Sequence, residues 1–174
     1  MNTVIKGILK QGDHAVISSL EHNAVVRPLE TLKKNKIEYS VAECVPYDDE
    51  QTIDNFRKQF KSNTKLVICT HASNVFGIKL PIERIGALCR LNGILFCVDA
   101  AQSAGTADIN LSDSCIDFLC TAGHKGLYGP MGTGLLIINS ETTPDSLIQG
   151  GTGSDSANLN QPEILPDKYE SGTP

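Results

Sequence analysis

Three features are missing from this chain, and each absence narrows its possible functions. The 174 residues carry a net charge of −5 and no long basic run, so we do not expect nucleic acid or an anionic membrane surface as the main partner. No apolar run approaches the ~20 residues of a membrane span, and the first residues turn polar too early for a signal peptide. We therefore expect a cytoplasmic protein that acts on a small molecule.

Motifs for disulfide, zinc and dinucleotide sites are also lacking. The six cysteines never form a CxxC pair and lie mostly inside apolar runs, so we interpret them as small core residues and predict no metal site. No GxGxxG run follows the first predicted strand, and the glycine-rich "GPMGTG" lies between two predicted strands instead. A dinucleotide-binding module stays open only as the alternative from another functional class.

The sequence does contain an alternation of helical and strand patterns. Continuous apolar runs such as residues 94–98 are typical of strands that are covered on both faces. Their order predicts an α/β protein, with a mostly parallel sheet between two layers of helices. The predicted strands cover residues 14–20, 36–44, 65–71, 93–100, 116–123 and 132–139, and the predicted helices begin near residues 4, 24, 48 and 81, the second with Pro28 in its first turn.

The composition changes after Asn139. Residues 141–174 are rich in Ser, Thr, Gly, Pro and Asn and lack a regular period, which predicts a loop-rich tail behind a core of residues 1–140. Both ends are expected to be cuts within a longer protein. The first helix has no capping residue before it, and the tail ends in the turn-rich "ESGTP".

Polar side chains follow the predicted strands at the point where each strand ends. His22, Asn74, Asp99 and Lys125 each follow a different strand, and parallel α/β sheets bind ligands at these carboxyl ends. An aspartate after a buried strand can hold a cationic ring nitrogen, and a lysine near it can form an imine with an aldehyde. Pyridoxal phosphate needs this pair of groups.

Two motifs carry a resemblance to a known family. "VDAAQSAG" around Asp99 and "TAGHKGLYGPMGTG" around Lys125 are joined, in the family's order, by "EHNA", "HASNVFG" and "GGTGS". Together they resemble the class V aminotransferases, in particular the cysteine desulfurase and selenocysteine lyase branch, over essentially the whole chain. The resemblance implies the large domain of a fold type I pyridoxal-phosphate enzyme, a homodimer, L-cysteine as the substrate, and a place in sulfur metabolism and iron–sulfur cluster assembly.

The resemblance also implies a role for each matching residue. Lys125 would form the Schiff base with pyridoxal 5'-phosphate and later move the α-proton of the substrate, and Asp99 would pair with the ring nitrogen. The other residues would contact the cofactor: Gln102 and Asn74 near its phenolic oxygen, His22 over its ring face, Thr121 and His124 at its phosphate, and Thr152 at the phosphate of the neighbouring subunit.

Each of these residues also has a simpler explanation. Lys125 could be a solvated loop lysine, and Asp99 could be the N-cap of a helix. His22 could lie in a turn with a hydrogen-bonded imidazole, and Asn74 could form an Asx-turn. Gln102 could be an exposed helix residue, and without the resemblance Thr152 would be a loop residue among glycines.

Some parts of the family pattern are not found in the 174 residues. The resemblance places a further phosphate-holding loop before Met1, and a substrate-binding arginine and a persulfide-forming cysteine after Pro174. We therefore expect conversion of L-cysteine to L-alanine only in a longer protein, with the sulfur passed to a cysteine outside this chain. Another class V activity (aminotransferase, selenocysteine lyase or epimerase) and an inert excerpt remain as alternatives.

Overall fold

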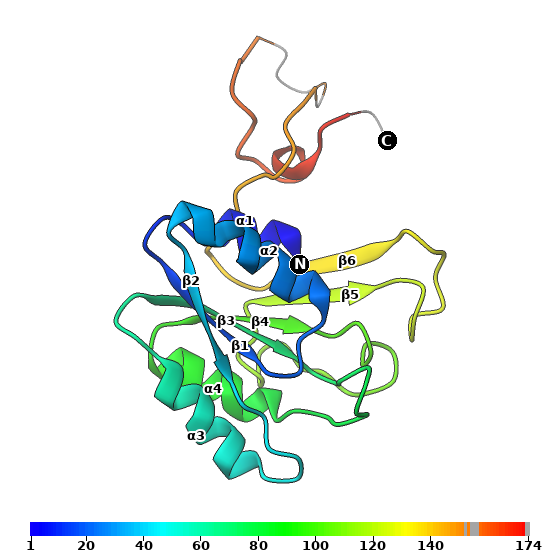
Figure 1. The fold of residues 1–174 in the computed structure, drawn as a ribbon. Coiled ribbons are helices and arrows are strands. Elements are labelled where there is room, and N and C mark those ends of the chain that lie inside the picture. The colour runs from blue at the N-terminus through cyan, green and yellow to red at the C-terminus, as the bar shows by residue number, and fades with distance from the viewer. Residues whose placement is uncertain (152, 154–156, 173–174) are drawn as a thin grey trace.

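Helices and strands alternate along the chain, as Figure 1 shows for this computed structural model, which describes residues 1–151, 153 and 157–172. The helices are α1 (Asn2–Ile8), α2 (Asn23–Leu32), α3 (Asp49–Gln59) and α4 (Ile82–Leu91), with short 3-10 helices η1 (Lys33–Asn35) and η2 (Asp167–Tyr169). The strands are β1 (His14–Ser18), β2 (Glu38–Ala42), β3 (Thr64–Thr70), β4 (Leu95–Asp99), β5 (Phe118–Ala122) and β6 (Gly134–Ile138). The predicted helices and strands are confirmed, with small differences at their ends.

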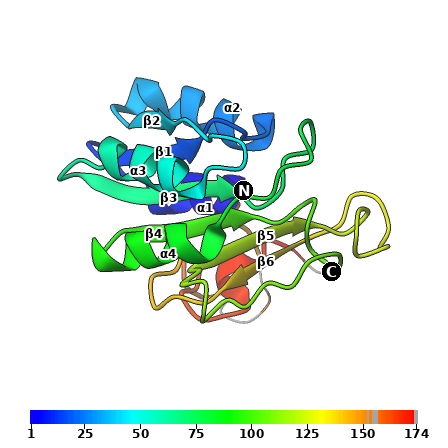
Figure 2. The same ribbon diagram turned by 90° about the horizontal axis from the view of Figure 1, so that it is seen from below.

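The six strands form one sheet in the order β2-β1-β3-β4-β5-β6, which Figure 2 shows from β2 at the top to β6 at the bottom. Strands β1 to β5 pair in parallel. Strand β6 runs antiparallel to β5, with Ile138 opposite Phe118. The mostly parallel sheet of the predicted α/β fold is therefore confirmed.

Helices cover both faces of the sheet. Successive side chains of a strand point to opposite faces. Val67 and Phe96 accordingly pack with α3 and α4, whereas Ile68 and Cys97 pack with α1 and α2. Asp99 follows Cys97 by two positions, so its side chain points to the α1 and α2 side of the sheet. The alternation of side chains along β4 therefore places a carboxylate on this face, at the end of a buried strand.

Two details differ from the predictions. Pro28 lies in the second turn of α2, because the helix begins at Asn23 and is capped by His22. The carbonyl that loses its intrahelical donor at Pro28 is that of Ala24, an exposed residue. Cys115 is partly exposed, whereas the other five cysteines are buried as predicted.

The tail that begins at residue 141 contains turns and the helix η2. Two hydrogen bonds hold η2 against the start of the tail: the Lys168 amine donates to Thr143 Oγ1 over 3.0 Å, and the Tyr169 hydroxyl donates to the Pro144 carbonyl over 2.8 Å. The division between a core of residues 1–140 and this tail stays a prediction. No helix in the described part of the chain is both long and apolar enough to cross a membrane.

The packing of α4 on the sheet generates a first prediction, for Gly86→Ala. At a solvent-exposed position inside a helix, replacing glycine by alanine stabilises the protein by roughly 1 kcal/mol. Here the new Cβ would lie 1.9 Å from the Ser114 carbonyl oxygen and 3.1 Å from Phe96 Cδ1, so backbone must shift. We expect the free energy of unfolding in urea to fall by about 1–3 kcal/mol. Leu91→Ala, at an 86% exposed position of the same helix, is the control and should change it little. A stabilised Gly86→Ala protein would contradict the packing.

Candidate functional site

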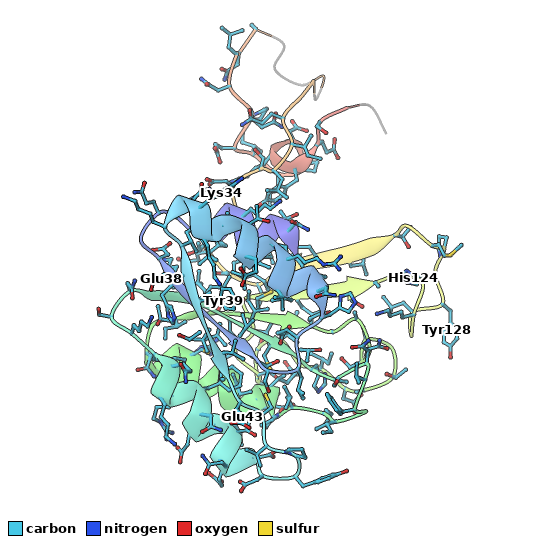
Figure 3. The ribbon with its side chains drawn as sticks, viewed as in Figure 1. Lys34, Glu38, Tyr39, Glu43, His124 and Tyr128 are labelled. Carbon is cyan, nitrogen blue, oxygen red and sulfur yellow. The ribbon has the colours of Figure 1, made fainter. Side chains whose placement is uncertain are left out.

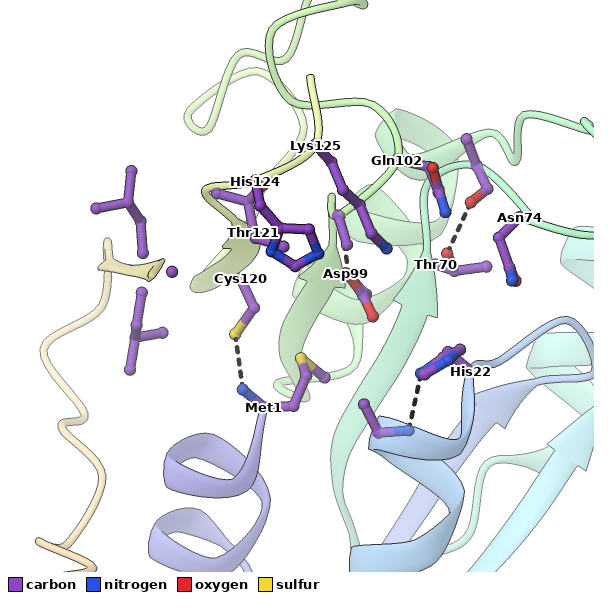
Figure 4. Close-up of a pocket in the computed structure, with 17 residues that line it drawn as sticks. Met1, His22, Thr70, Asn74, Asp99, Gln102, Cys120, Thr121, His124 and Lys125 are labelled. Carbon is purple, nitrogen blue, oxygen red and sulfur yellow. Dashed lines mark hydrogen bonds between the residues drawn. The ribbon is translucent and has the colours of Figure 1, made fainter. Parts of the chain in front are cut away.

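A pocket of about 600 Å3 lies where β3, β4 and β5 end (Figure 4). Its volume falls within the roughly 300–1,000 Å3 of small-molecule sites. Of the predicted site residues, Thr152 lies outside the described part of the chain. The structure brings the others together in the lining of this pocket: His22, Asn74, Asp99, Gln102, Thr121, His124 and Lys125.

The register of the sheet positions Asp99 at the floor of the pocket. Asp99 is the last residue of β4, opposite Thr70 of β3 and Cys120 of β5. It is only 7% exposed, so its carboxylate is removed from most of the surrounding water. Its Oδ1 accepts a hydrogen bond from the Ala101 amide over 2.9 Å. Asp99 therefore does cap the turn that follows β4, and it also faces the pocket.

Lys125 lies on the loop that follows β5. The loop is closed by backbone hydrogen bonds: the Tyr128 amide donates to the Lys125 carbonyl, and the Gly123 amide donates to the Thr133 carbonyl, each over 2.9 Å. Figure 3 places His124 and Tyr128 of this loop at the end of the molecule away from β2. In Figure 4 the side chains of Lys125 and Asp99 are both directed into the pocket. An amine and a buried carboxylate thus share one cavity.

Glycines allow the Lys125 loop to approach the turn that follows Asp99. A Cβ on Gly126 would lie 2.4 Å from the Ala104 carbonyl oxygen, and a Cβ on Gly105 would lie 2.4 Å from the Gly126 carbonyl oxygen. Gly105 also has a φ of +81°, a conformation that side chains disfavour. The two backbone segments that carry Asp99 and Lys125 therefore touch at positions where only glycine fits.

His22 enters the pocket from the start of α2. Its Nδ1 accepts a hydrogen bond from the Ala24 amide over 3.1 Å and caps the helix. A neutral imidazole that accepts at Nδ1 carries its hydrogen on Nε2. The His22 imidazole is thus hydrogen-bonded within a turn, as the simpler explanation expects. The same hydrogen bond holds the ring beside the pocket.

Asn74 and Gln102 lie on the side of the pocket opposite Thr121 and His124 in Figure 4. The turn around Asn74 is made by Ser73, whose Oγ accepts from the amides of the two residues after Asn74 over 3.3 Å each. The Asx-turn explanation for Asn74 is therefore not what the structure shows. Thr121 Oγ1 donates to the Ala100 carbonyl over 3.4 Å, a long bond that leaves the hydroxyl near the cavity.

Three of the five buried cysteines offer little nucleophilicity. Burial raises the pKa of the Cys44, Cys69 and Cys89 thiols, which keeps them protonated at neutral pH. The thiolate is the reactive form, so these residues serve as core residues.

Comparison with known proteins places the chain in a family. Residues 1–174 match the family described as Aminotransferase class-V. The chain belongs to this family. A probable cysteine desulfurase of Pyrococcus abyssi is 35% identical to this class-V chain over 98% of the chain and 43% of its own length. The resemblance drawn from the Asp99 and Lys125 motifs is therefore confirmed.

Solved structures agree with this class-V assignment. A cysteine desulfurase of Thermococcus onnurineus NA1 superposes with a TM-score of 0.80 at 35% identity, over 99% of this chain and 45% of that one. SspA in complex with cysteine superposes with a TM-score of 0.73 at 31% identity, over 86% and 44%. The chain thus spans less than half the length of each of these relatives.

One contact that orders the class-V pocket has no signal in the sequence. His71 is buried after β3, and its Nδ1 lies 2.9 Å from Ser103 Oγ in the turn after β4. The His71 amide donates to the Asp99 carbonyl over 2.9 Å. These bonds hold the turn of Gln102 against the end of β3. Nothing in the sequence signals a pair that is 32 residues apart.

The contact between the two loops generates a second prediction, for Gly126→Ala. The added methyl group must push the Lys125 loop away from the Ala104 carbonyl oxygen. We expect the free energy of unfolding to fall by about 1–3 kcal/mol, measured by urea denaturation. Gly172→Ala is the control, because a Cβ there meets no atom within 4 Å. If the Gly126→Ala protein were as stable as the control, the two loops would not be in contact.

Proposed function

We propose that this chain is the cofactor-binding core of a pyridoxal-phosphate-dependent cysteine desulfurase. The enzyme would convert L-cysteine to L-alanine and pass the sulfur to a cysteine outside these residues. One observation carries the proposal: the Lys125 amine and the buried Asp99 carboxylate line one pocket of a class-V domain. The names of the relatives support the activity, and the SspA structure with cysteine supports the substrate.

The groups that line the pocket suit pyridoxal phosphate. The cofactor has an aldehyde, a ring nitrogen and a phosphate, which need an amine, an acid and hydrogen-bond donors, respectively. Lys125 supplies the amine and Asp99 the acid, and the pocket also contains the Thr121 hydroxyl and the His124 imidazole. Apolar side chains such as Leu136 form part of the remaining lining. When bound, the cofactor supplies an aldehyde that takes up amines and a ring that draws electrons from the substrate Cα.

Asp99 would hold the ring nitrogen in its protonated form. A carboxylate that is 7% exposed interacts strongly with a neighbouring cation, because little water screens the pair. The Ala101 amide, which donates to Oδ1, fixes the direction of the carboxylate. The backbone hydrogen bond between His71 and Asp99 keeps this residue at the end of β4.

Lys125 would bind the aldehyde carbon through Nζ. When its amine is free, Lys125 would take up the α-proton of the substrate and could return a proton. The Gly126 contact with Ala104 sets the distance of Lys125 from the turn after Asp99. Lys125 is thus proposed to act as both the anchor and the general base.

The remaining pocket residues would bind and orient. Thr121 and His124 would donate hydrogen bonds to the phosphate, and Thr152 of a neighbouring subunit would add another. Gln102 and Asn74 would donate from their amides to the phenolic oxygen and the substrate carboxylate. His22 would lie over the ring face, held there by the Ala24 amide.

We also propose that the enzyme is a cytoplasmic homodimer. Large apolar side chains are exposed on β6 and the loop before it, and an exposed apolar patch is a common feature of subunit contacts. Strand β6 is the edge of the sheet, so a second copy can cover it. The exposed side chains are Tyr128, Met131, Leu135 and Ile137.

A turnover assay tests the proposed activity. The protein expressed from its complete gene, with pyridoxal phosphate added, should form equal amounts of L-alanine and transferable sulfur from L-cysteine. Lys125→Ala should lower the rate by about 100-fold or more, the usual loss on removing a general base. Lys65→Ala, at an exposed position near the start of β3 and outside the pocket lining, is the control. Transfer of the amino group to a keto acid, without alanine formation, would indicate an aminotransferase instead.

A further inference from the structure

A buried glutamate lies next to the pocket and has no part in the roles described above. Glu21 follows β1 and directly precedes His22. Its Oε1 accepts a hydrogen bond from the Thr70 amide over 2.6 Å and another from the Ser18 hydroxyl. The same Ser18 Oγ accepts from the Leu20 amide over 3.3 Å. One carboxyl oxygen thus connects the end of β1 to the end of β3.

The Glu21 carboxyl group is buried, although the residue as a whole is partly exposed. Among the described residues, no group forms a hydrogen bond with Oε2. Burial raises the pKa of Glu21 to about 8. The two hydrogen bonds to Oε1 oppose this rise in pKa, and the nearby Asp99 carboxylate adds to it. A raised pKa favours the protonated carboxyl group, and its proton would lie on Oε2 because Oε1 accepts two hydrogen bonds.

A neutral Glu21 is compatible with the site around it. The titratable groups near its carboxyl group are Asp99 from β4, Cys69 from β3 and Cys44 after β2. A charged Glu21 would place a second carboxylate near Asp99, and two like charges disfavour each other. In the neutral form, Glu21 accepts hydrogen bonds without competing with Asp99 for the cation proposed to bind there.

The contacts of Glu21 reach two residues of the pocket. Through the chain it adjoins His22, the N-cap of α2. Through the Thr70 amide it holds the last residue of β3, which pairs with Asp99 in the sheet. Thr70 itself lines the pocket, and its hydroxyl donates to the Ala72 carbonyl over 3.1 Å.

We propose that Glu21 is a positioning residue, which uses its carboxyl group as a hydrogen-bond acceptor to hold the His22 segment against the end of β3 beside Asp99. This inference rests on the proposed function only for the statement that the pocket binds pyridoxal phosphate. The hydrogen bonds themselves do not depend on the cofactor. Glutamine has the same shape and keeps the acceptor oxygen, so Glu21→Gln should keep the hydrogen bond to the Thr70 amide. Glu21→Ala and Glu21→Asp should lose this contact.

The test is hydrogen exchange and NMR on the protein from the complete gene, before pyridoxal phosphate is added. In the wild type and in Glu21→Gln, the Thr70 amide should be protected and the His22 ring nitrogens should show the same signals. In Glu21→Ala and Glu21→Asp, exchange of the Thr70 amide should be at least 10-fold faster and the His22 signals should shift. Glu43→Ala, at an exposed glutamate at the end of β2, is the matched control and should leave both unchanged.

Cofactor affinity gives a second readout. Pyridoxal phosphate, titrated by its visible absorption, should bind Glu21→Asp several-fold more weakly than the wild type and bind Glu21→Gln equally well. If Glu21→Ala does not fold, Glu21→Asp and Glu21→Gln still decide the question. Unchanged Thr70 exchange and His22 signals in Glu21→Asp, or the same losses in Glu21→Gln, would overturn the proposal. A wild type with the expected NMR signals that binds no cofactor would instead contradict the proposed function.

Discussion

Burial of the parallel sheet on both faces is the constraint on which the rest of this structure depends. Each strand of the centre alternates its side chains between two apolar layers, one against α1 and α2 and one against α3 and α4. Polar groups can therefore gather only where the strands end. Asp99 lies at such an end, two positions after the buried Cys97, and its carboxylate remains largely shielded from water. The same packing that stabilises the core thus creates the low-dielectric floor of the pocket.

The second requirement of the pocket is a close approach of two loops. Asp99 and Lys125 come from different strands, and only contact between the segments behind them brings the two side chains into one cavity. Gly105 and Gly126 allow that contact, since a side chain at either position would collide with a backbone carbonyl. The His71–Ser103 hydrogen bond holds the same turn from the other side. The geometry of the site is therefore set by backbone contacts outside the polar residues themselves.

The fold could be predicted from the sequence because its pattern is local. Continuous apolar runs mark the buried strands, and amphipathic segments mark the helices between them. The antiparallel direction of β6 could not be predicted from its own residues, since it depends on how the chain returns past β5. The second-turn position of Pro28 depends on the cap at His22, a hydrogen bond that sequence spacing does not show. The Asp99 and Lys125 motifs identified the pocket, but the bonds of Glu21 and His71 join segments far apart in the chain and leave no sequence signal.

The central claim is that Lys125 is the amine that binds pyridoxal phosphate. The most direct measurement is borohydride reduction of the protein from the complete gene, after incubation with pyridoxal phosphate, followed by mass spectrometry of its peptides. A single label on Lys125 is the predicted result, because no other lysine lines this pocket among the described residues. A label on Lys79, which lines a different pocket, or on Lys168, which binds Thr143 and Glu163 in the tail, would contradict the account.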